Sequence, residues 1–451
     1  MSTRLAKTAL SILAMMAAAG AAGRADAAGF QLFEQSPSGQ GDAFAGAAAV
    51  AEDASTIFYN PAGMTYLKSP ETVVGVHVIW PEATFEPHVA RAFNGAPLRG
   101  DPSPDGGEVA AIPNLYGMVP LDYGLAAGIG VSEPFGLVTD YGNTWIGRYY
   151  AERSDLRTID VNPSLAWKAT DWLSIGGGVD FMRADVKLTN AVDFGTICAT
   201  SAASLFCPAF GLAPQANDGK AKLVAHDTAV GYNAGIMLQP LEQTRIGLTY
   251  RSKYHLNFNG DAHFDVPTAF RAFQGATGTS PLFTNTGARA EVTLPETVSG
   301  AIYQEITPKW AVMGDVTWTH WSSFKFLTVQ FDNPFQPEQT THEGWHNSFR
   351  EAAGFIYSPN EKSKLRFGIA YDETPVPTSN RTFRIPDDNR FWLSIGYNLH
   401  VWEGLSFDAA YTHIFVLGNA EVNTSNPLNG FISGTTDAQV NIFAVGLRYQ
   451  F

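Results

Sequence analysis

Hydrophobic and polar side chains alternate one by one over long stretches of the chain after residue 67. In residues 365–372, for example, every odd position is a large apolar residue, and the even positions are Arg, Gly, Ala and Asp. The same period of two recurs at 158–168, 246–251 and 391–398. Because successive side chains of a β-strand point to opposite faces, this pattern predicts strands with one apolar and one polar face.

The alternation defines a series of candidate strands that continues to the end of the chain. The strands are expected near residues 71–81, 112–119, 124–132, 156–169, 173–194, 221–239, 244–264, 288–306, 310–331, 347–358, 364–376, 389–401, 405–422 and 439–451. There are about fourteen of them, and bacterial membrane barrels have an even number of strands. The predicted fold class is therefore all-β, an antiparallel transmembrane β-barrel.

The connections between these strands are short and long in turn. Short ones fall at 121–123, 170–172, 240–243, 307–309 and 359–363, and long ones near 82–111, 133–155, 195–220, 265–287, 332–346, 377–388 and 423–438. An outer-membrane barrel shows this alternation because tight turns face the periplasm and longer loops face outside. A soluble β-sandwich, the alternative, has no reason to sort its loops by length.

Composition agrees with a membrane barrel. Mean hydropathy is −0.07, which is neutral because lipid-facing and lumen-facing residues average out. Charged residues make up 16%, against about 25% in soluble domains. The formal charge of −14 argues against nucleic acid as a partner. The last strand alternates to a terminal Phe451, similar to the strand by which barrel assembly machinery receives such proteins.

The first 27 residues have the features of a signal peptide. Arg4 and Lys7 are basic, residues 10–22 are apolar and small, and Ala25-Asp26-Ala27 forms an A-x-A cleavage site. A membrane helix is the alternative, but this apolar run is shorter than the ~18 residues that a helix needs to span a bilayer. We expect a mature chain that begins at Ala28.

Residues 28–67 differ from everything that follows them. They lack strand alternation, and they are too polar and rich in glycine to form a membrane helix. We therefore divide the chain into a signal peptide (1–27), a folded but irregular N-terminal segment (28–67) and a barrel (68–451). A barrel interior would give this segment a place, as a plug that we call the hatch (residues 28–67).

Two further features bear on chemistry. Cys198 and Cys207 are close in sequence in an exported chain, which favours a disulfide over two free thiols. His342-Glu343-Gly344-Trp345-His346 formally matches the zinc-protease motif H-E-x-x-H. That motif works on a helix, whereas Gly344 and the nearby prolines oppose a helix here. We expect no catalytic residues, no metal and no cofactor.

An ordered set of short motifs resembles the FadL-type family (OmpP1/FadL/TodX), outer-membrane channels for long-chain fatty acids and other hydrophobic compounds. The matches are Ala28-Gly29-Phe30-Gln31-Leu32, Asn60-Pro61-Ala62, Pro134-Phe135-Gly136-Leu137, Asn233-Ala234-Gly235-Ile236, Leu248-Thr249-Tyr250-Arg251-Ser252, Pro375-Val376-Pro377, Asn380-Arg381, Ile385-Pro386-Asp387 and Arg390-Phe391-Trp392-Leu393-Ser394. The resemblance implies a fourteen-stranded barrel plugged by the hatch. It also implies capture of substrate outside, an interior apolar pocket, and passive exit sideways into the bilayer through a kinked third strand.

Candidate site residues follow from this resemblance. In the hatch they are Phe30, Asn60, Pro61 and Ala62, where Asn60 either ties a turn near the pocket or only anchors the plug. Pro134 and Gly136 weaken strand pairing and would permit a lateral opening, or they mark an ordinary strand end. Candidate ligand contacts are Phe135 and five loop residues, Phe206, Phe210, Phe270, Phe273 and Phe283, although loop-on-loop packing explains the five equally well.

The partner of a fatty acid carboxylate is less clear. Thr341 stands where relatives carry a basic residue, and Arg183, Lys187, Arg366 or Arg384 could replace it. This departure leaves an aromatic hydrocarbon possible as the ligand, and an outer-membrane lipase is a further alternative. We expect a monomer in the outer membrane of a Gram-negative bacterium, in contact with membrane lipid and lipopolysaccharide.

Overall fold

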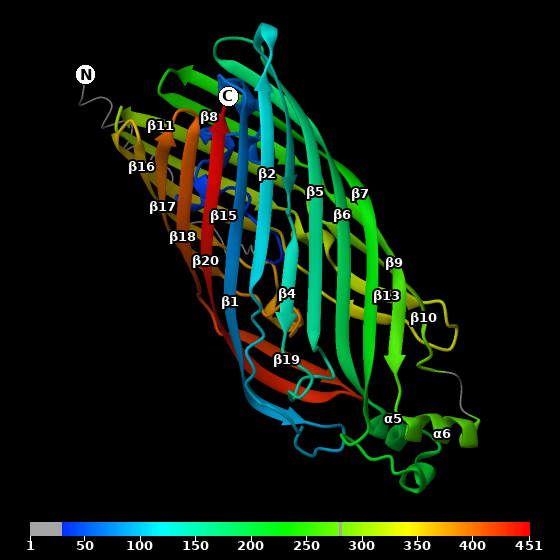
Figure 1. The fold of residues 1–451 in the computed structure, drawn as a ribbon. Coiled ribbons are helices and arrows are strands. Elements are labelled where there is room, and N and C mark those ends of the chain that lie inside the picture. The colour runs from blue at the N-terminus through cyan, green and yellow to red at the C-terminus, as the bar shows by residue number, and fades with distance from the viewer. Residues whose placement is uncertain (1–28, 279–281) are drawn as a thin grey trace.

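The computed structural model describes residues 29–278 and 282–451, so the expected signal peptide lies outside the described residues. All strands belong to one antiparallel sheet, which closes into a fourteen-stranded barrel (Figure 1). The first strand, β1 (Glu71–Arg91), pairs with the last, β20 (Gly430–Gln450), from Glu71–Gln450 to Arg91–Phe431. This pairing leaves no free sheet edge, which a bilayer would not tolerate.

Some barrel strands are continuous and others are interrupted. The continuous strands besides β1 and β20 are β2 (Ala110–Pro120), β5 (Arg153–Lys168), β6 (Leu173–Asp193), β7 (Asp218–Leu241), β16 (Ser363–Asp372) and β17 (Arg390–Trp402). The interrupted strands are β3 (Leu125–Ser132) with β4 (Gly136–Asp140), β8 (Thr244–Arg251) with β9 (Tyr254–Asp265), β10 (Thr286–Leu294) with β11 (Thr297–Thr307), β12 (Trp310–Thr319) with β13 (Phe326–Phe331), β14 (Gln339–His342) with β15 (Ser348–Asn360), and β18 (Leu405–Val416) with β19 (Ala420–Asn426).

The predicted strands are confirmed in number and order, with differences at their ends. The expected loops at 82–111 and 423–438 are too long, because β1 continues to Arg91 and β20 already begins at Gly430. These extensions lie beyond the apolar part of each strand, where the period of two fades. The long connections carry helices at one end of the barrel, namely α5 (Phe194–Thr200), η3 (Ser204–Phe210) and α6 (Thr268–Thr277).

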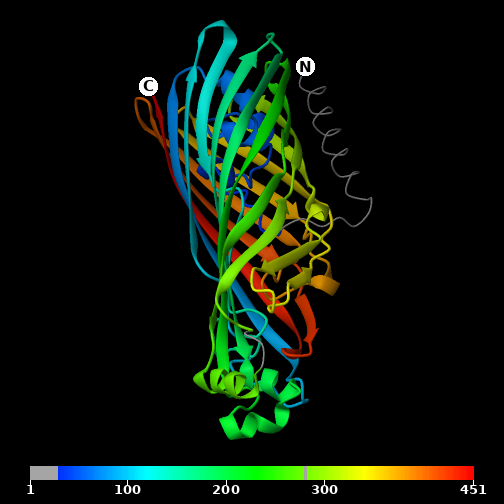
Figure 2. The same ribbon diagram turned by 90° about the vertical axis from the view of Figure 1, so that its right-hand side faces the viewer.

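The N-terminal segment lies inside the barrel, near the end opposite to α5 and α6 (Figures 1 and 2, blue). It contains the short helices α2 (Pro37–Gln40), α3 (Ala47–Val50), α4 (Thr56–Tyr59) and η1 (Pro61–Tyr66). Phe44 packs with inward-facing strand residues such as Trp392. Glycines on the wall let the hatch backbone come close as well, since a Cβ on Gly368 would lie 2.0 Å from the Asp42 carbonyl.

The two faces of the barrel wall differ in polarity. Large apolar side chains point outward and stay exposed, including Leu165, Phe181, Val230 and Leu248. Buried polar side chains point inward, such as Asp160 on β5. The remaining short helices are η2 (Asp122–Gly124), η4 (Trp321–Ser323) and η5 (Thr378–Asn380). Among the described residues, no helix has the length and apolar character needed to span a bilayer.

Candidate functional site

The third barrel strand is broken at residues 133–135. Before the break, β3 pairs with β2 on one side and with β5 on the other. After it, β4 pairs with β5, from Gly136–Arg157 to Asp140–Arg153, and forms no ladder with β2; on that side Thr139 has an isolated bridge to Gly107, which precedes β2. Pro134 has no amide hydrogen to donate to a neighbouring strand, which accounts for the break at this position. The barrel wall therefore loses its β2 contact at the point where Pro134 and Gly136 were expected to weaken it.

The hatch takes the place of the missing strand. The amide of Leu32 donates to the Pro134 carbonyl at 2.9 Å, and the amide of Gly136 donates to the Phe30 carbonyl at 3.0 Å. Gln31 and Phe135 face each other between these two bonds, as a pair in an antiparallel bridge. A short piece of the hatch thus completes the hydrogen bonding of the wall from inside.

Gln35 adds a side-chain clamp to the same break. Its Nε2 donates to the Glu133 carbonyl at 2.8 Å, and its Oε1 accepts from the Glu133 amide at 3.1 Å. On the other side, the Thr158 hydroxyl donates to the Phe135 carbonyl at 2.6 Å and accepts from the Phe135 amide at 3.0 Å. The backbone at the break is therefore satisfied by side chains and by the hatch, without β2.

Phe30 is the centre of a buried aromatic cluster beside the break. Its ring centroid lies 4.8 Å from that of Trp321, 5.6 Å from that of Trp345 and 6.2 Å from that of Phe135. Aromatic contacts of this kind each stabilise by about 0.5–1.5 kcal/mol beyond burial. The first described residue is also fixed, because the Gly29 amide donates to Asp387 Oδ2 at 2.8 Å.

A small cavity of about 60 Å³ lies between the hatch and the wall. Its apolar lining comes from Leu32, Phe33, Phe44, Phe58, Pro134 and Phe135. Its polar lining includes Arg251, Asp315 and Arg350. An apolar chamber with a few convergent charged groups is the usual form of a small-molecule site. This chamber borders directly on the break in the third strand.

The two arginines of the cavity are bonded to different extents. Arg251 Nη1 contacts Asp180 Oδ1 at 2.6 Å, and its Nη2 donates to the Phe58 carbonyl at 2.9 Å. Arg350 is 1% exposed, and its Nη2 donates to the Ala43 carbonyl at 2.6 Å. Its Nε and Nη1 have no hydrogen-bond partner among the described residues, and Asp315 Oδ2 is 4.0 Å from Nη1. Arg350 can therefore accept an anionic group.

Asn60 makes side-chain hydrogen bonds within the hatch and to the wall. Its Oδ1 accepts from the Ala62 amide at 3.1 Å, where Pro61 begins η1. Its Nδ2 donates to the Ala48 carbonyl at 2.7 Å and to the Ile236 carbonyl of β7 at 3.1 Å. Asn60 is fully buried and does not line the cavity described above. This geometry holds the turn in place against the wall.

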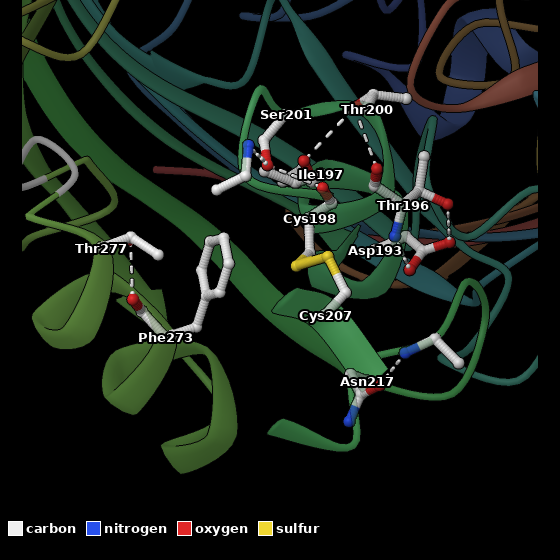
Figure 3. The surroundings of a disulfide bond; sticks show 12 residues. Asp193, Thr196, Ile197, Cys198, Thr200, Ser201, Cys207, Asn217, Phe273 and Thr277 are labelled. Carbon is white, nitrogen blue, oxygen red and sulfur yellow. Dashed lines mark hydrogen bonds between the residues drawn. A yellow bond between two sulfur atoms is a disulfide. The ribbon is translucent and has the colours of Figure 1, made fainter. Parts of the chain in front are cut away.

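The loop aromatics gather around a disulfide at the far end of the barrel. Cys198 and Cys207 are joined and lie among Phe273 and the helices of this end (Figure 3). The rings of Phe270 and Phe273 are buried, and Phe210 and Phe283 pack against them. Phe206 is 58% exposed and its neighbour Leu205 is 91% exposed. Loop-on-loop packing thus describes four of the five predicted phenylalanines, and Phe206 remains open to solvent.

The four expected carboxylate partners lie apart from one another. Arg183 and Lys187 are on the outer face of β6, because Met182 and Ala184 point inward to the aromatic cluster. Arg366 is buried and paired with Glu52 and Asp408, both at 2.9 Å. Arg384 is a half-buried loop residue that donates to the Ser154 hydroxyl at 3.0 Å. None of the four lines the cavity at the break.

Sequence reasoning missed Arg251 and Arg350. A signal for Arg251 was present, since Ile246, Leu248 and Tyr250 point outward and Arg251 must then point inward. Strand parity also excludes Arg183, which lies between the inward positions 182 and 184. The sequence therefore predicts on which side of the wall a charged side chain lies. It does not predict which residues across the barrel that side chain contacts.

The H-E-x-x-H segment at residues 342–346 forms no helix in the structure. His342 ends β14, and Glu343 to His346 connect it to β15 without helical structure. Glu343 is buried and accepts a hydrogen bond from Trp345 Nε1 at 3.1 Å. Burial raises the pKa of Glu343 from 4.5 to about 7, although Arg384 and the Trp345 bond partly oppose this. Within the described residues, no group of three or more His, Cys, Asp or Glu could hold a metal ion.

Comparison with known proteins decides the family. Residues 18–451 match the family described as outer membrane protein transport protein (OMPP1/FadL/TodX). The long-chain fatty acid transport protein of Salmonella typhi is 31% identical over 398 residues, covering 86% of this chain and 87% of that protein. Outer membrane protein P1 of Haemophilus influenzae is 30% identical over 464 residues, covering 96% and 97%. The chain belongs to the OmpP1/FadL/TodX family.

Solved structures share the fold of this OmpP1/FadL/TodX protein. A Pseudomonas aeruginosa FadL homologue superposes with a TM-score of 0.85 at 24% identity, covering 94% of this chain and 100% of that chain. The Pseudomonas putida toluene transporter TodX superposes with a TM-score of 0.66 at 14% identity, covering 94% and 99%. The protein is thus a barrel of the Gram-negative outer membrane, in a family of transport proteins rather than enzymes.

Proposed function

We propose that the protein carries long-chain fatty acids, or similar amphiphiles with one anionic head, passively across the outer membrane. The observation that carries this proposal is the apolar cavity beside the broken third strand, with Arg350 buried in its lining. Two of its relatives, from Salmonella typhi and Escherichia coli, are named long-chain fatty acid transport proteins. The proposal extends that substrate to this chain.

The route begins at the loops and ends in the wall. Leu205 and Phe206 are exposed apolar side chains at the loop end, and they would make first contact with substrate. The substrate would then occupy the cavity and leave between β2 and β4. Lateral exit keeps the acyl chain out of bulk water, where each exposed CH₂ costs about 0.8 kcal/mol.

Exit requires the hatch to leave the break. Leu32 and Gln35 hydrogen-bond to the backbone at 133–134, and Phe30 bonds to Gly136, so the gap beside β2 is closed in this structure. Each such bond contributes about 0.5–1.5 kcal/mol net. A substrate that displaces Phe30 from its aromatic cluster would weaken the contact and open the gap. In this proposal the hatch (28–67) acts as the gate for the barrel (68–451).

Arg350 favours a carboxylate over a hydrocarbon. A buried guanidinium with two unbonded donors costs free energy, and a ligand carboxylate would satisfy both donors. Toluene has no acceptor strong enough to do so. We therefore place the fatty acid ahead of the aromatic hydrocarbon as substrate.

Uptake into a strain that lacks its own transporter of this family tests the proposal. Radiolabelled oleate should enter faster with the protein than without it. This increase in uptake should be larger for oleate than for toluene. If neither compound enters faster, or if only toluene does, the proposed substrate is wrong. Rapid ester hydrolysis by the purified barrel would instead support an enzyme.

Several further expectations remain proposals. We propose cleavage of the signal peptide after residue 27, insertion by barrel assembly machinery, and a monomeric barrel surrounded by membrane lipid and lipopolysaccharide. Monomeric mass in detergent and an N-terminus at Ala28 would support the first and third of these.

A further inference from the structure

The hatch encloses a small void of its own, which we call the hatch void. Every residue that lines it belongs to the hatch, and its volume is about 30 Å³. The polar side chains of its lining include Ser36, Ser38, Asp42, Asp53 and Ser55. One buried water needs about 10–15 Å³ of such space and two to four polar partners. The hatch void therefore suits about two water molecules.

Asp42 is the side chain of the hatch void that most requires water. It is 3% exposed, and none of the described residues forms an ion pair with it. Asp53, by contrast, accepts from the Ser38 hydroxyl at 2.6 Å and from the Ser55 hydroxyl at 2.5 Å. A buried carboxylate without a partner is costly, so we expect water beside Asp42.

Helix α3 connects the hatch void with a space on either side of it. Ala47 lines both the hatch void and the cavity at the break. Val50 lines both the hatch void and a third space of about 260 Å³, which we call the vestibule. Ala47 and Val50 are both half-buried, and they are three residues apart, about 4.5 Å along a helix. Only about one helical turn of the hatch therefore separates the cavity from the vestibule.

The vestibule lies at the end of the barrel that carries the short turns. The exposed residues 307–310 line it, together with Lys364, which directly follows another short turn. Short turns of an outer-membrane barrel face the periplasm. Glu52 borders both the vestibule and the hatch void, and it is paired with Lys364 and with Arg366, the latter at 2.9 Å. The boundary of the hatch void on this side is thus polar.

We propose that water crosses the hatch through these three spaces, from the periplasm to the cavity at the break. The use of this path rests on the proposed function. A ligand that leaves sideways into lipid draws no water back by that route, because the hydrocarbon core holds none. The cavity must nevertheless refill, since Arg350 Nε and Nη1 have no hydrogen-bond partner among the described residues. Water that passes Val50 and Ala47 supplies those partners while the barrel wall stays closed.

Osmotic shrinkage of proteoliposomes tests the proposal, followed by stopped-flow light scattering of the mature protein without fatty acid. Wild-type liposomes should shrink faster than protein-free liposomes. Ala47→Leu should remove about nine tenths of this excess rate, because the added carbons occupy space that a close-packed interior cannot replace. Val50→Ala should increase the excess rate, because it widens the boundary with the vestibule.

Ala234→Leu is the matched control, because it adds the same side chain on the exposed outer face of β7 and should shrink like the wild type. Heat-dependent migration on gels shows that each variant forms a folded barrel. Wild-type liposomes that shrink no faster than protein-free ones would overturn the path, and so would an Ala47→Leu rate equal to that of the wild type. Oleate uptake by cells is a separate measurement. Its failure beside rapid water flow would contradict the proposed function and leave the path intact.

Discussion

Arg350 shows how a single side chain sets the chemistry of the interior. Its guanidinium carbon lies 4.5 Å from the centre of the Phe33 ring in the hatch and 5.1 Å from that of Trp392 on β17, so it packs between hatch and wall. One of its three nitrogens is bonded to the hatch backbone at Ala43, a second lies 4.0 Å from Asp315 Oδ2, and neither this second nitrogen nor Nε makes a hydrogen bond among the described residues. In the proposed route, the residue that binds the head of the substrate is also the one that donates to the hatch backbone.

Arg350→Gln should weaken oleate binding by about 10–100-fold, because a charge-assisted hydrogen bond contributes about 1.5–3 kcal/mol. Toluene binding should stay the same. Arg289→Gln is the matched control, because that side chain is 65% exposed on the outside. Calorimetric titration of the purified barrel measures both ligands. Unchanged oleate affinity in Arg350→Gln would remove this residue from the binding site.

The raised pKa of Glu343 predicts that the stability of the fold depends on pH. Its pKa is raised by burial from 4.5 to about 7, so the protonated carboxyl is the form that the fold favours. The contribution is fully present below pH 4.5 and is lost as the pH rises through about 7. It amounts to roughly 3.5 kcal/mol, since the pKa rises from 4.5 to about 7 and one pKa unit corresponds to about 1.4 kcal/mol.

Glu343→Gln should therefore match the wild type in thermal stability at pH 4.5 and exceed it at pH 8. The amide keeps an acceptor for Trp345 Nε1 and does not ionise. Circular dichroism melts at both pH values measure the difference, in which other titrating groups cancel. A constant difference between the two proteins from pH 4.5 to pH 8 would contradict the raised pKa.

At the scale of elements, the break in the third strand and the hatch form one unit. The side-chain amide of Gln35 bonds both the N–H and the C=O of Glu133. The backbone of a paired strand would make the same two bonds. The break itself is bound to the hatch by two backbone bonds and by the two Gln35 bonds, whereas Asn60 and Glu52 tie the rest of the hatch to the wall. Only the first residues of the hatch therefore need to move for the gap to open. The continuous pairing of β1 with β20 over twenty positions shows the contrast, because that contact is part of the permanent wall.

Gln35→Ala should loosen the hatch at the break by about 1–3 kcal/mol, because the Glu133 backbone loses both partners. Hydrogen exchange at residues 133–136 should accelerate about tenfold or more. Gln439→Ala, which removes an exposed side-chain bond to Glu82, serves as the control. Exchange that is no faster than in the control would show that Gln35 does not hold the break.

The strands could be predicted from the sequence, but the contacts across the lumen could not. Strand order followed from a local period of two, and Pro134 with Gly136 located the break. The partner of the break could not be predicted, because Phe30 and Leu32 are about a hundred positions away and have no strand pattern of their own. For the same reason Arg350 was missed, since its ring partner Phe33 belongs to the hatch.

On the scale of the whole molecule, the protein is a closed wall with one interrupted strand and a plug that covers the interruption. Loops at one end present Leu205 and Phe206, and the interior offers an apolar cavity with Arg350. The outer surface places charged side chains beyond the apolar band. We propose that transport depends on the contact of hatch residues 30–35 with the break, while the other contacts between hatch and wall stay in place.

A disulfide between the hatch and the break tests this account most directly. Gln31 and Phe135 face each other without mutual hydrogen bonds, and such pairs have Cα atoms about 4.5 Å apart, within disulfide range. Cells expressing Gln31→Cys/Phe135→Cys should take up radiolabelled oleate no faster than cells without the protein when oxidised. Reduction should restore uptake, while each single variant should be unaffected by oxidation. Equal uptake by the oxidised and reduced double variant would contradict exit through the break.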